Sequence, residues 1–270
     1  MAKSRSKPSG SRPQRSETAE TVRFMLKLAL FVLIFRSFLL APFSIPSESM
    51  LPRLYVGDYL FVSKWSYGYS RWSLPWGWPI LPDMHWSTPT RGDVVVFRSP
   101  GPDDHDVIKR VIGLPGDTIQ VRHGQVILNG TAIPKQRIGD FTIPVSPNYD
   151  CDPQFRDVAA GGQPICRYTQ FRETLPGGRT YAVLDRGEFP DRDDTGLYTV
   201  PAGNVFLMGD NRDDSADSRF PAPEGMGYIP MDRIEGKALV TFFSTDGSAQ
   251  WIKPWTWFSA ARPTRIAQGF

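Results

Sequence analysis

Residues 24–43, FMLKLALFVLIFRSFLLAPF, constrain this chain most, because they form its only apolar run of membrane length. As a helix, residues 22–40 would rise about 29 Å, which matches a hydrocarbon core of roughly 30 Å. Lys27 and Arg36 interrupt the run, but each lies near one end, where a long side chain can reach the interface. No small-x-small site follows, which disfavours a cleaved signal peptide, whereas a buried soluble helix remains an alternative.

Positive charge precedes this run, although the whole chain is nearly balanced at 31 basic and 28 acidic residues. Residues 1–21 hold too few apolar side chains to fold, so we predict a disordered basic arm. A solubility arm or a nucleic-acid tail are alternatives, but a basic arm before an apolar run fits the positive-inside rule. We therefore predict a transmembrane anchor over residues 22–42, a cytoplasmic amino terminus, residues after 43 outside, and no nucleic-acid partner.

The cysteine content agrees with that topology. Cys151 and Cys166 are the only two cysteines, and a compartment outside the cytoplasm permits disulfides. We predict that they form an intrachain disulfide; two unrelated free thiols are the alternative. Two cysteines without clustered histidines make a zinc site improbable, and we expect no metal.

Beyond the anchor, short stretches rich in β-branched and aromatic residues alternate with turn residues. Asn129-Gly130 is typical of a two-residue hairpin turn. The predicted fold is mainly β, with antiparallel, barrel-like sheets. The expected strands lie in residues 58–64, 93–99, 106–114, 118–133, 203–210 and 237–244.

Residues 134–202 differ from their surroundings, since they are rich in Pro, Gly, Asp and Arg and hold both cysteines. We predict a smaller inserted β subdomain there. The main β domain would comprise residues 43–133 and 203–250, followed by a C-terminal tail at 251–270.

Tryptophans gather in two places, residues 65–90 and 251–257. Aromatic side chains on irregular backbone suit a membrane interface, so contact with the bilayer surface is one interpretation. Ordinary packing is the other.

Two serines, Ser47 and Ser49, follow the apolar run in PSESMLP, residues 46–52. Pro46 favours an extended backbone, in which both hydroxyls point to the same side as Phe43 and Ile45. One serine could then attack a substrate while the other donates to an oxyanion. A polar turn is the alternative.

A serine nucleophile needs a base, and His85, His105 and His123 show no obvious triad partner. Lys109 could serve instead, because strand alternation places it on one face with Val107 and Val111, where burial would lower its pKa. An edge-strand lysine with its amine in water is the alternative.

The stretch GDNRDDSADSR, residues 209–219, is dense in acidic residues and suggests a calcium loop at first. Ser218 in place of the required glycine, and Pro221 and Pro223 after it, disfavour an EF-hand. A rigid loop held by Asp, Asn and Ser hydrogen bonds fits better.

Taken together, the chain resembles bacterial type I signal peptidases, the serine-lysine endopeptidases that remove signal peptides from exported preproteins. The resemblance spans residues 43 to about 245. The stretches that carry it, in the family's order, are PSESMLP (46–52), GDYLFVSK (57–64), RGDVVVF (91–97), IKRVIGLPGD (108–117) and GDNRDDSADSR (209–219).

The resemblance implies a role for each matching residue. Ser49 would be the nucleophile and Lys109 the general base. Ser47 and the Ser49 N–H would form the oxyanion hole, and Ser215 would hydrogen-bond and orient the lysine amine. The supporting residues would be Arg110 and Asp210 as an ion pair, with Asp217 and Arg219. Those lining shallow pockets for small residues at −1 and −3 would be Phe43, Ile45, Met50, Val96 and Ile108.

This sequence departs from the family's pattern at Glu48, where glycine is frequent, and at Arg53, where threonine is frequent. The implied activity is signal-peptide removal through an acyl-enzyme at the bacterial inner membrane, with the catalytic domain outside the cytoplasm. The expected partners are exported preproteins and the lipid bilayer, and no cofactor or metal is expected. The alternatives are a specialised peptidase for a pilus or conjugation precursor and a non-catalytic, membrane-tethered β scaffold.

Overall fold

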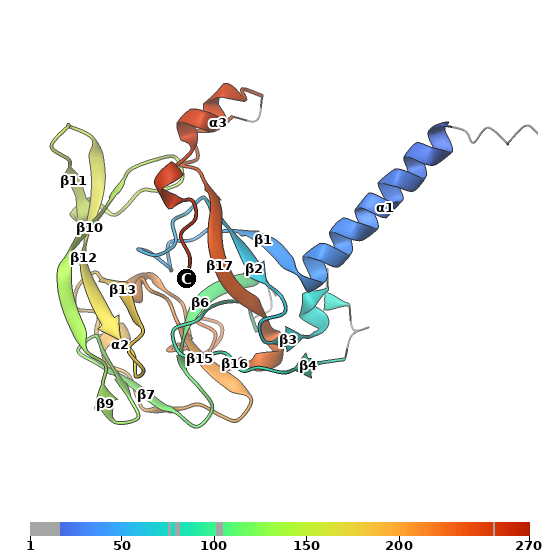
Figure 1. Cartoon of the computed structure of the whole chain (residues 1–270). Helices are drawn as coiled ribbons and strands as arrows, with labels where there is room; N and C mark the ends of the chain where they lie inside the picture. Colours follow the sequence, from blue (N-terminus) through green and yellow to red (C-terminus); the bar gives the residue numbers. More distant parts are fainter. Residues whose placement is uncertain (1–16, 75–76, 79–81, 101–104, 251) are drawn as a thin grey trace, which may run out of the picture.

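Antiparallel sheets make up most of this protein, which agrees with the predicted mainly β fold (Figure 1). The computed structural model describes residues 17–74, 77–78, 82–100, 105–250 and 252–270. All named strand pairs in these ranges are antiparallel.

A seven-stranded sheet has the order β1-β2-β17-β5-β6-β15-β16. Its strands are β1 (Leu40–Ser44), β2 (Asp58–Ser63), β5 (Val94–Arg98), β6 (Asp106–Gly113), β15 (Asn204–Met208), β16 (Ile229–Pro230) and β17 (Ile234–Ser244). The order places β17, late in the chain, between the hairpin β1–β2 and the hairpin β5–β6. Valines fill β5, and the register sets Val95 opposite Lys109.

A second sheet has the order β14-β7-β8-β9. Its strands are β7 (Thr118–Arg122), β8 (Gln125–Leu128), β9 (Thr131–Ala132) and β14 (Tyr198–Thr199). The predicted hairpin turn joins β8 to β9, and Asn129 and Gly130 both have positive φ, at 51° and 76°. A two-residue turn of this hand matches the twist of the strands, which is why the Asn-Gly pair predicted it.

Residues 134–202 contain a third sheet of β10 (Lys135–Pro144), β11 (Arg156–Val158), β12 (Pro164–Thr174) and β13 (Thr180–Asp185). The predicted disulfide joins Cys151 to Cys166 near the β11–β12 hairpin. This part shares its core with the rest, since Leu51 packs in one cluster with Ile143 and Leu184. The division into a main and an inserted domain stays a prediction.

Helix α1 (Glu17–Phe38) extends away from the sheets with its apolar side chains exposed (Figure 1). No helix among the described residues combines the length and the apolar character needed to cross a membrane, so the predicted anchor over 22–42 is not supported. Arg23, Lys27 and Arg36 divide the apolar residues of the helix, and the chain enters strand β1 at Leu40. Most of the predicted disordered arm, residues 1–16, lies outside the described residues.

The segment predicted as a tail packs back onto the sheet. It contains α3 (Trp255–Ala260), and Arg265 beyond it donates to the buried Asp58 of β2 at 2.6 Å. The short strands and the α-helix that remain among the described residues are β3 (Gly68–Tyr69), β4 (Met84–His85) and α2 (Pro190–Asp193). Two of the clustered tryptophans, at 76 and 251, lie outside the described residues, while Trp65, Trp86 and Trp255 are exposed.

Candidate active site

Ser49 contacts Lys109, which belongs to the seven-stranded sheet. Ser49 lies in the turn after β1, Lys109 lies in the middle of β6, and both are buried. The Lys109 amine nitrogen Nζ lies 2.5 Å from the Ser49 hydroxyl oxygen Oγ. The two side chains therefore have the contact that a proton transfer between them requires.

Burial lowers the pKa of the Lys109 amine from 10.5 to about 8. The loss of solvation disfavours the ammonium form, while the carboxylates of Asp217, Asp210 and Asp214 oppose the shift in that order. The direction is the one expected from the valine-flanked strand position. At neutral pH a usable fraction of this lysine is unprotonated.

Ser47 is exposed, and its Oγ lies 3.4 Å from the Ser49 Oγ. The peptide that joins them is held from the opposite loop, because Asn211 donates its backbone N–H to the Ser49 carbonyl at 3.0 Å and its side-chain amide to the Glu48 carbonyl at 3.3 Å. These two bonds fix the nucleophile segment against residues 209–215. Sequence reasoning did not single out Asn211, although it lies in a stretch that the resemblance includes.

Gly209 lets this loop approach the nucleophile closely. A Cβ at position 209 would lie 2.3 Å from the Ser215 Oγ and 2.5 Å from the Ser49 carbonyl oxygen, which no real side chain allows. The Ser215 hydroxyl is buried and has no hydrogen-bond partner among the described residues. The expected hydrogen bond from Ser215 to the Lys109 amine is therefore not formed here.

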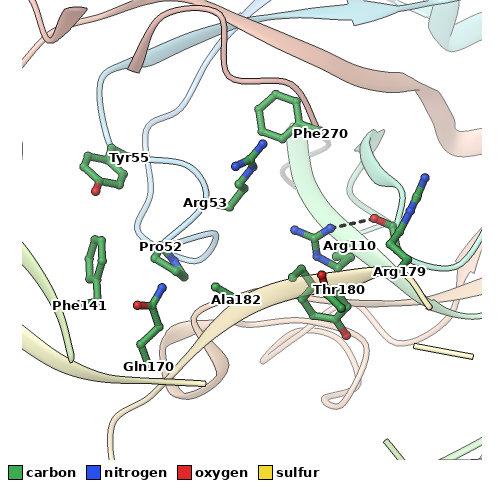
Figure 2. A pocket seen from close by; sticks show the side chains of 12 residues that line it. Pro52, Arg53, Tyr55, Arg110, Phe141, Gln170, Arg179, Thr180, Ala182 and Phe270 are labelled. Atoms are coloured by element: carbon green, nitrogen blue, oxygen red, sulfur yellow. Dashed lines mark hydrogen bonds between the residues drawn. The ribbon is translucent and has the colours of Figure 1, made fainter. Parts of the chain in front are cut away.

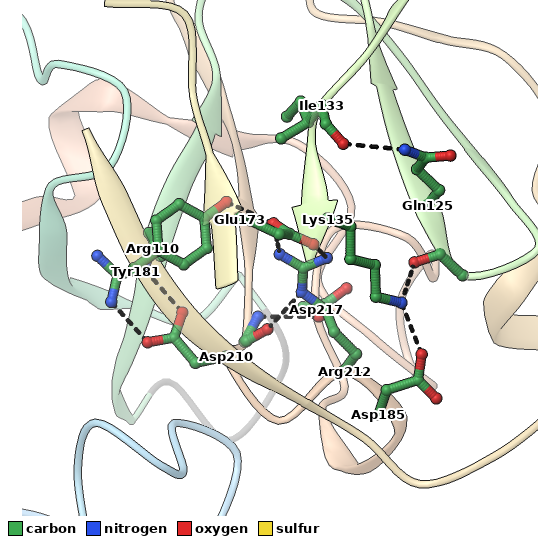
Figure 3. A network of polar contacts seen from close by, with 12 residues as sticks. Arg110, Gln125, Ile133, Lys135, Glu173, Tyr181, Asp185, Asp210, Arg212 and Asp217 are labelled. Atoms are coloured by element: carbon green, nitrogen blue, oxygen red, sulfur yellow. Dashed lines mark hydrogen bonds and ion pairs between the residues drawn. The ribbon is translucent and has the colours of Figure 1, made fainter. Parts of the chain in front are cut away.

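The expected ion pair between Arg110 and Asp210 is present and buried (Figure 3). Arg110 donates from Nε and Nη2 to the two oxygens of Asp210 at 2.7 and 2.6 Å. Asp217 is also fully enclosed, and it accepts from the Arg219 Nε at 2.9 Å and from the Gly209 N–H at 3.0 Å. Both carboxylates thus pair with an arginine and hold the loop that covers Lys109.

The five residues expected to line substrate pockets gather in one apolar cluster. The same cluster also contains Leu54, Leu60 and Val62, which are fully buried. The cluster contains Ile45, Met50, Val96 and Ile108, with Phe43 packed against it. Because Met50 follows the nucleophile directly, the apolar surface begins beside Ser49.

A buried polar network behind the site was not predicted (Figure 3). Glu173 on β12 accepts from both terminal nitrogens of Arg212 at 2.6 Å and from the Tyr181 hydroxyl at 2.7 Å. The Arg110 guanidinium lies 4.3 Å from the centre of the Tyr181 ring. The network links the third sheet to the loop under the dyad, but Glu173 and Arg212 lie 39 residues apart and no local pattern marks the pair.

The described residues offer one grouping with the atoms of a metal site, namely Asp150, Cys151 and Cys166. Both sulfurs belong to the disulfide and cannot act as thiolate ligands.

Comparison with known proteins places this arrangement in a family. The family described as signal peptidase, peptidase S26, matches residues 18–243. Signal peptidase I of Rickettsia typhi is 33% identical over 247 residues, which cover 85% of this chain and 83% of that protein. Signal peptidase I of Rickettsia akari is 34% identical over 232 residues, covering 82% and 77%.

A solved structure of a signal peptidase I from Enterococcus faecalis is 24% identical and covers 56% of this chain and 97% of that one, with a TM-score of 0.29. That likeness is too distant to carry an argument. The match to the family and the identity to its members over most of the chain lead to one conclusion: the protein belongs to the signal peptidase family, peptidase S26, and is a serine peptidase.

Proposed function

We propose that this protein removes amino-terminal signal peptides from exported preproteins with Ser49 as nucleophile and Lys109 as general base. The observation that carries the proposal is the 2.5 Å contact between the Lys109 Nζ and the Ser49 Oγ in a buried setting. With a pKa of about 8, roughly a tenth of the lysine is neutral at pH 7, against about one part in 3,000 at a pKa of 10.5. Burial thus supplies the unprotonated amine.

The proposed reaction is an acyl transfer. Neutral Lys109 takes the Ser49 proton while the Ser49 oxygen attacks the carbonyl carbon of the scissile peptide. The oxyanion accepts hydrogen bonds from the Ser47 hydroxyl and the Ser49 N–H, and one such donor is worth about 3–4 kcal/mol. The lysine ammonium then protonates the leaving amine, and water activated by the same amine hydrolyses the ester.

Cleavage after small residues at −1 and −3 belongs to the same proposal. The apolar cluster beside Ser49 is already filled by its own side chains, since Ile45, Met50 and Val96 are almost fully buried. A shallow surface over a filled core has room for alanine-sized side chains and excludes larger ones.

The ion pairs Arg110–Asp210 and Asp217–Arg219 would act as positioning groups in this scheme. Each holds one end of the 209–219 loop, and neither touches the Ser49 hydroxyl in the described contacts. Ser215 is proposed to orient the lysine amine after rotation of its unpaired hydroxyl, for example once substrate is bound.

The catalytic part is proposed to lie outside the cytoplasm, as its exported substrates require. The Cys151–Cys166 disulfide supports this location, because disulfides persist in oxidising compartments. The lipid bilayer is also proposed as a partner, because Trp65, Trp86 and Trp255 are exposed and tryptophan side chains favour the membrane interface.

The test is cleavage of several purified preproteins, followed by sequencing of each new amino terminus. Ser49→Ala and Lys109→Met should each abolish cleavage, whereas the exposed controls Ser44→Ala and Lys253→Met should retain it. The kcat/KM of the wild type should rise about tenfold per pH unit up to about pH 8 and then level off. If either folded variant, Ser49→Ala or Lys109→Met, kept near wild-type turnover, the assignment of Ser49 as nucleophile and Lys109 as base would be wrong.

The same panel addresses the specialised alternative. Cleavage of one pilus or conjugation precursor, with none of the general preproteins processed, would favour that narrower role. Membership in a peptidase family already favours an enzyme over a non-catalytic scaffold.

A further inference from the structure

A cavity of about 460 Å³ lies on the side of β6 that Arg110 faces, and the proposed mechanism makes no use of it (Figure 2). Arginines from three separate segments line it: Arg53 from the turn after the nucleophile, Arg110 from β6, and Arg179 from the turn before β13. No acidic side chain is among the described residues that line it. The cavity therefore presents positive charge from several directions.

Two of these arginines have carboxylate partners outside the cavity. Arg110 pairs with Asp210 and also donates to the Gly92 carbonyl at 2.8 Å. Arg179 pairs with Asp93 at 2.6 Å, but Asp93 also pairs with Lys237 at 2.7 Å. One carboxylate thus serves two cations, so the charge of Arg179 is only partly balanced.

Arg53 has no carboxylate within ion-pair distance among the described residues. Its guanidinium lies 5.2 Å from the centre of the Phe270 ring, and its side chain is half-buried. Burial lowers the pKa of Arg53, and the neighbouring charges of Arg110 and Arg265 lower it further. A guanidinium in such surroundings is stabilised by an anion that enters from solvent.

Other groups around the cavity suit the rest of a ligand. The Gln170 amide points toward Pro52 and Arg53, where it can donate or accept (Figure 2). The rings of Tyr55, Phe141 and Phe270 provide apolar walls. The volume falls within the range of small-molecule pockets and exceeds the space that a lone inorganic anion fills.

We propose that this cavity binds a phosphate group carried by a small organic substituent. Arginine forks match phosphate oxygens, and the arginines come from three different segments, which suits the several oxygens of a tetrahedral group. The aromatic walls would contact the substituent. Two sources share this chemistry, a soluble phosphate ester and the headgroup of an anionic phospholipid. The binding itself does not depend on the Ser49–Lys109 assignment.

The experiment is calorimetric titration of the full chain with inorganic phosphate and with glycerol 3-phosphate, at ionic strength held constant with chloride. Wild type and the exposed control Arg122→Gln should show saturable binding, and Arg53→Gln should bind about tenfold or more weakly. Gln170→Leu, checked for fold by circular dichroism, is a second variant that should weaken binding of the ester without removing a charge.

Vesicles separate the two sources. Binding to phosphatidylglycerol vesicles but not to phosphatidylcholine vesicles, weakened in Arg53→Gln and not in Arg122→Gln, would identify a lipid headgroup. Binding of soluble glycerol 3-phosphate with the same dependence on Arg53 would identify a soluble ester. The proposal is overturned if neither glycerol 3-phosphate nor phosphatidylglycerol vesicles bind saturably. It is also overturned if Arg53→Gln and Arg122→Gln bind these probes equally well.

Discussion

Lys109→Met should make the protein more stable at pH 7 while it abolishes catalysis. The fold lowers the pKa of Lys109 from 10.5 to about 8, so the folded protein binds this proton more weakly than the unfolded chain does. Below pH 8 the native state therefore carries a penalty of about 3 kcal/mol, at 1.36 kcal/mol for each pH unit between the two values. Methionine has a similar shape and no charge to desolvate, so the variant escapes this penalty.

The sign of the effect also fixes its pH dependence. For a lysine with a lowered pKa, the stability of the wild type rises as pH increases from 8 to 10.5, because the native state has already lost the proton that the unfolded chain still binds. The advantage of Lys109→Met should be largest at and below pH 8 and should shrink toward pH 10.5.

Urea unfolding followed by tryptophan fluorescence at pH 7 and pH 10 would measure both quantities. Lys253→Met, an exposed position, controls for the loss of one lysine. Two results would refute the inference that burial deprives the Lys109 ammonium of solvation. One is a Lys109→Met variant that is less stable than wild type at pH 7; the other is a change in the free energy of unfolding that is equal at both pH values.

Two other variants test the surroundings of the dyad. Asp210→Asn should lower the free energy of unfolding by about 3–5 kcal/mol, because it leaves the Arg110 guanidinium buried without its counter-charge. Thermal melts should show this loss, and an unchanged melting temperature would contradict it. Burial and Asp214 raise the pKa of Glu48 to about 7, so Glu48→Gln should stabilise the protein above pH 7. Because Glu48 is only half-buried, the expected gain is about 1 kcal/mol after solvent screening. It should vanish near pH 4, and a gain of equal size at pH 4 and pH 8 in urea unfolding would rule out this origin.

Local patterns predicted much of the fold and of the site. The alternation in residues 106–114 and the turn at Asn129-Gly130 depend on neighbours in sequence, and both elements formed as expected. The Arg110–Asp210 pair followed from the family resemblance.

What the sequence did not predict depends on partners far apart in the chain. Arg265 reaches Asp58 across 207 residues, and no periodicity in either segment marks that pairing. The close approach of Gly209 to Ser49 likewise joins segments that lie far apart in the sequence. The predicted anchor over residues 22–42 is not supported, since no described helix is long and apolar enough to cross a membrane.

The place of β17 in the sheet has a consequence for the newly made protein. Within the seven-stranded sheet, β17 alone joins the hairpin that leads to Ser49 with the hairpin that carries Lys109. A ribosome adds about 5–20 residues per second, so on the order of ten seconds separates the synthesis of Lys109 from that of Ser244 at the end of β17. During that interval the growing chain holds both side chains of the proposed dyad but lacks the strand that joins their two hairpins in the sheet.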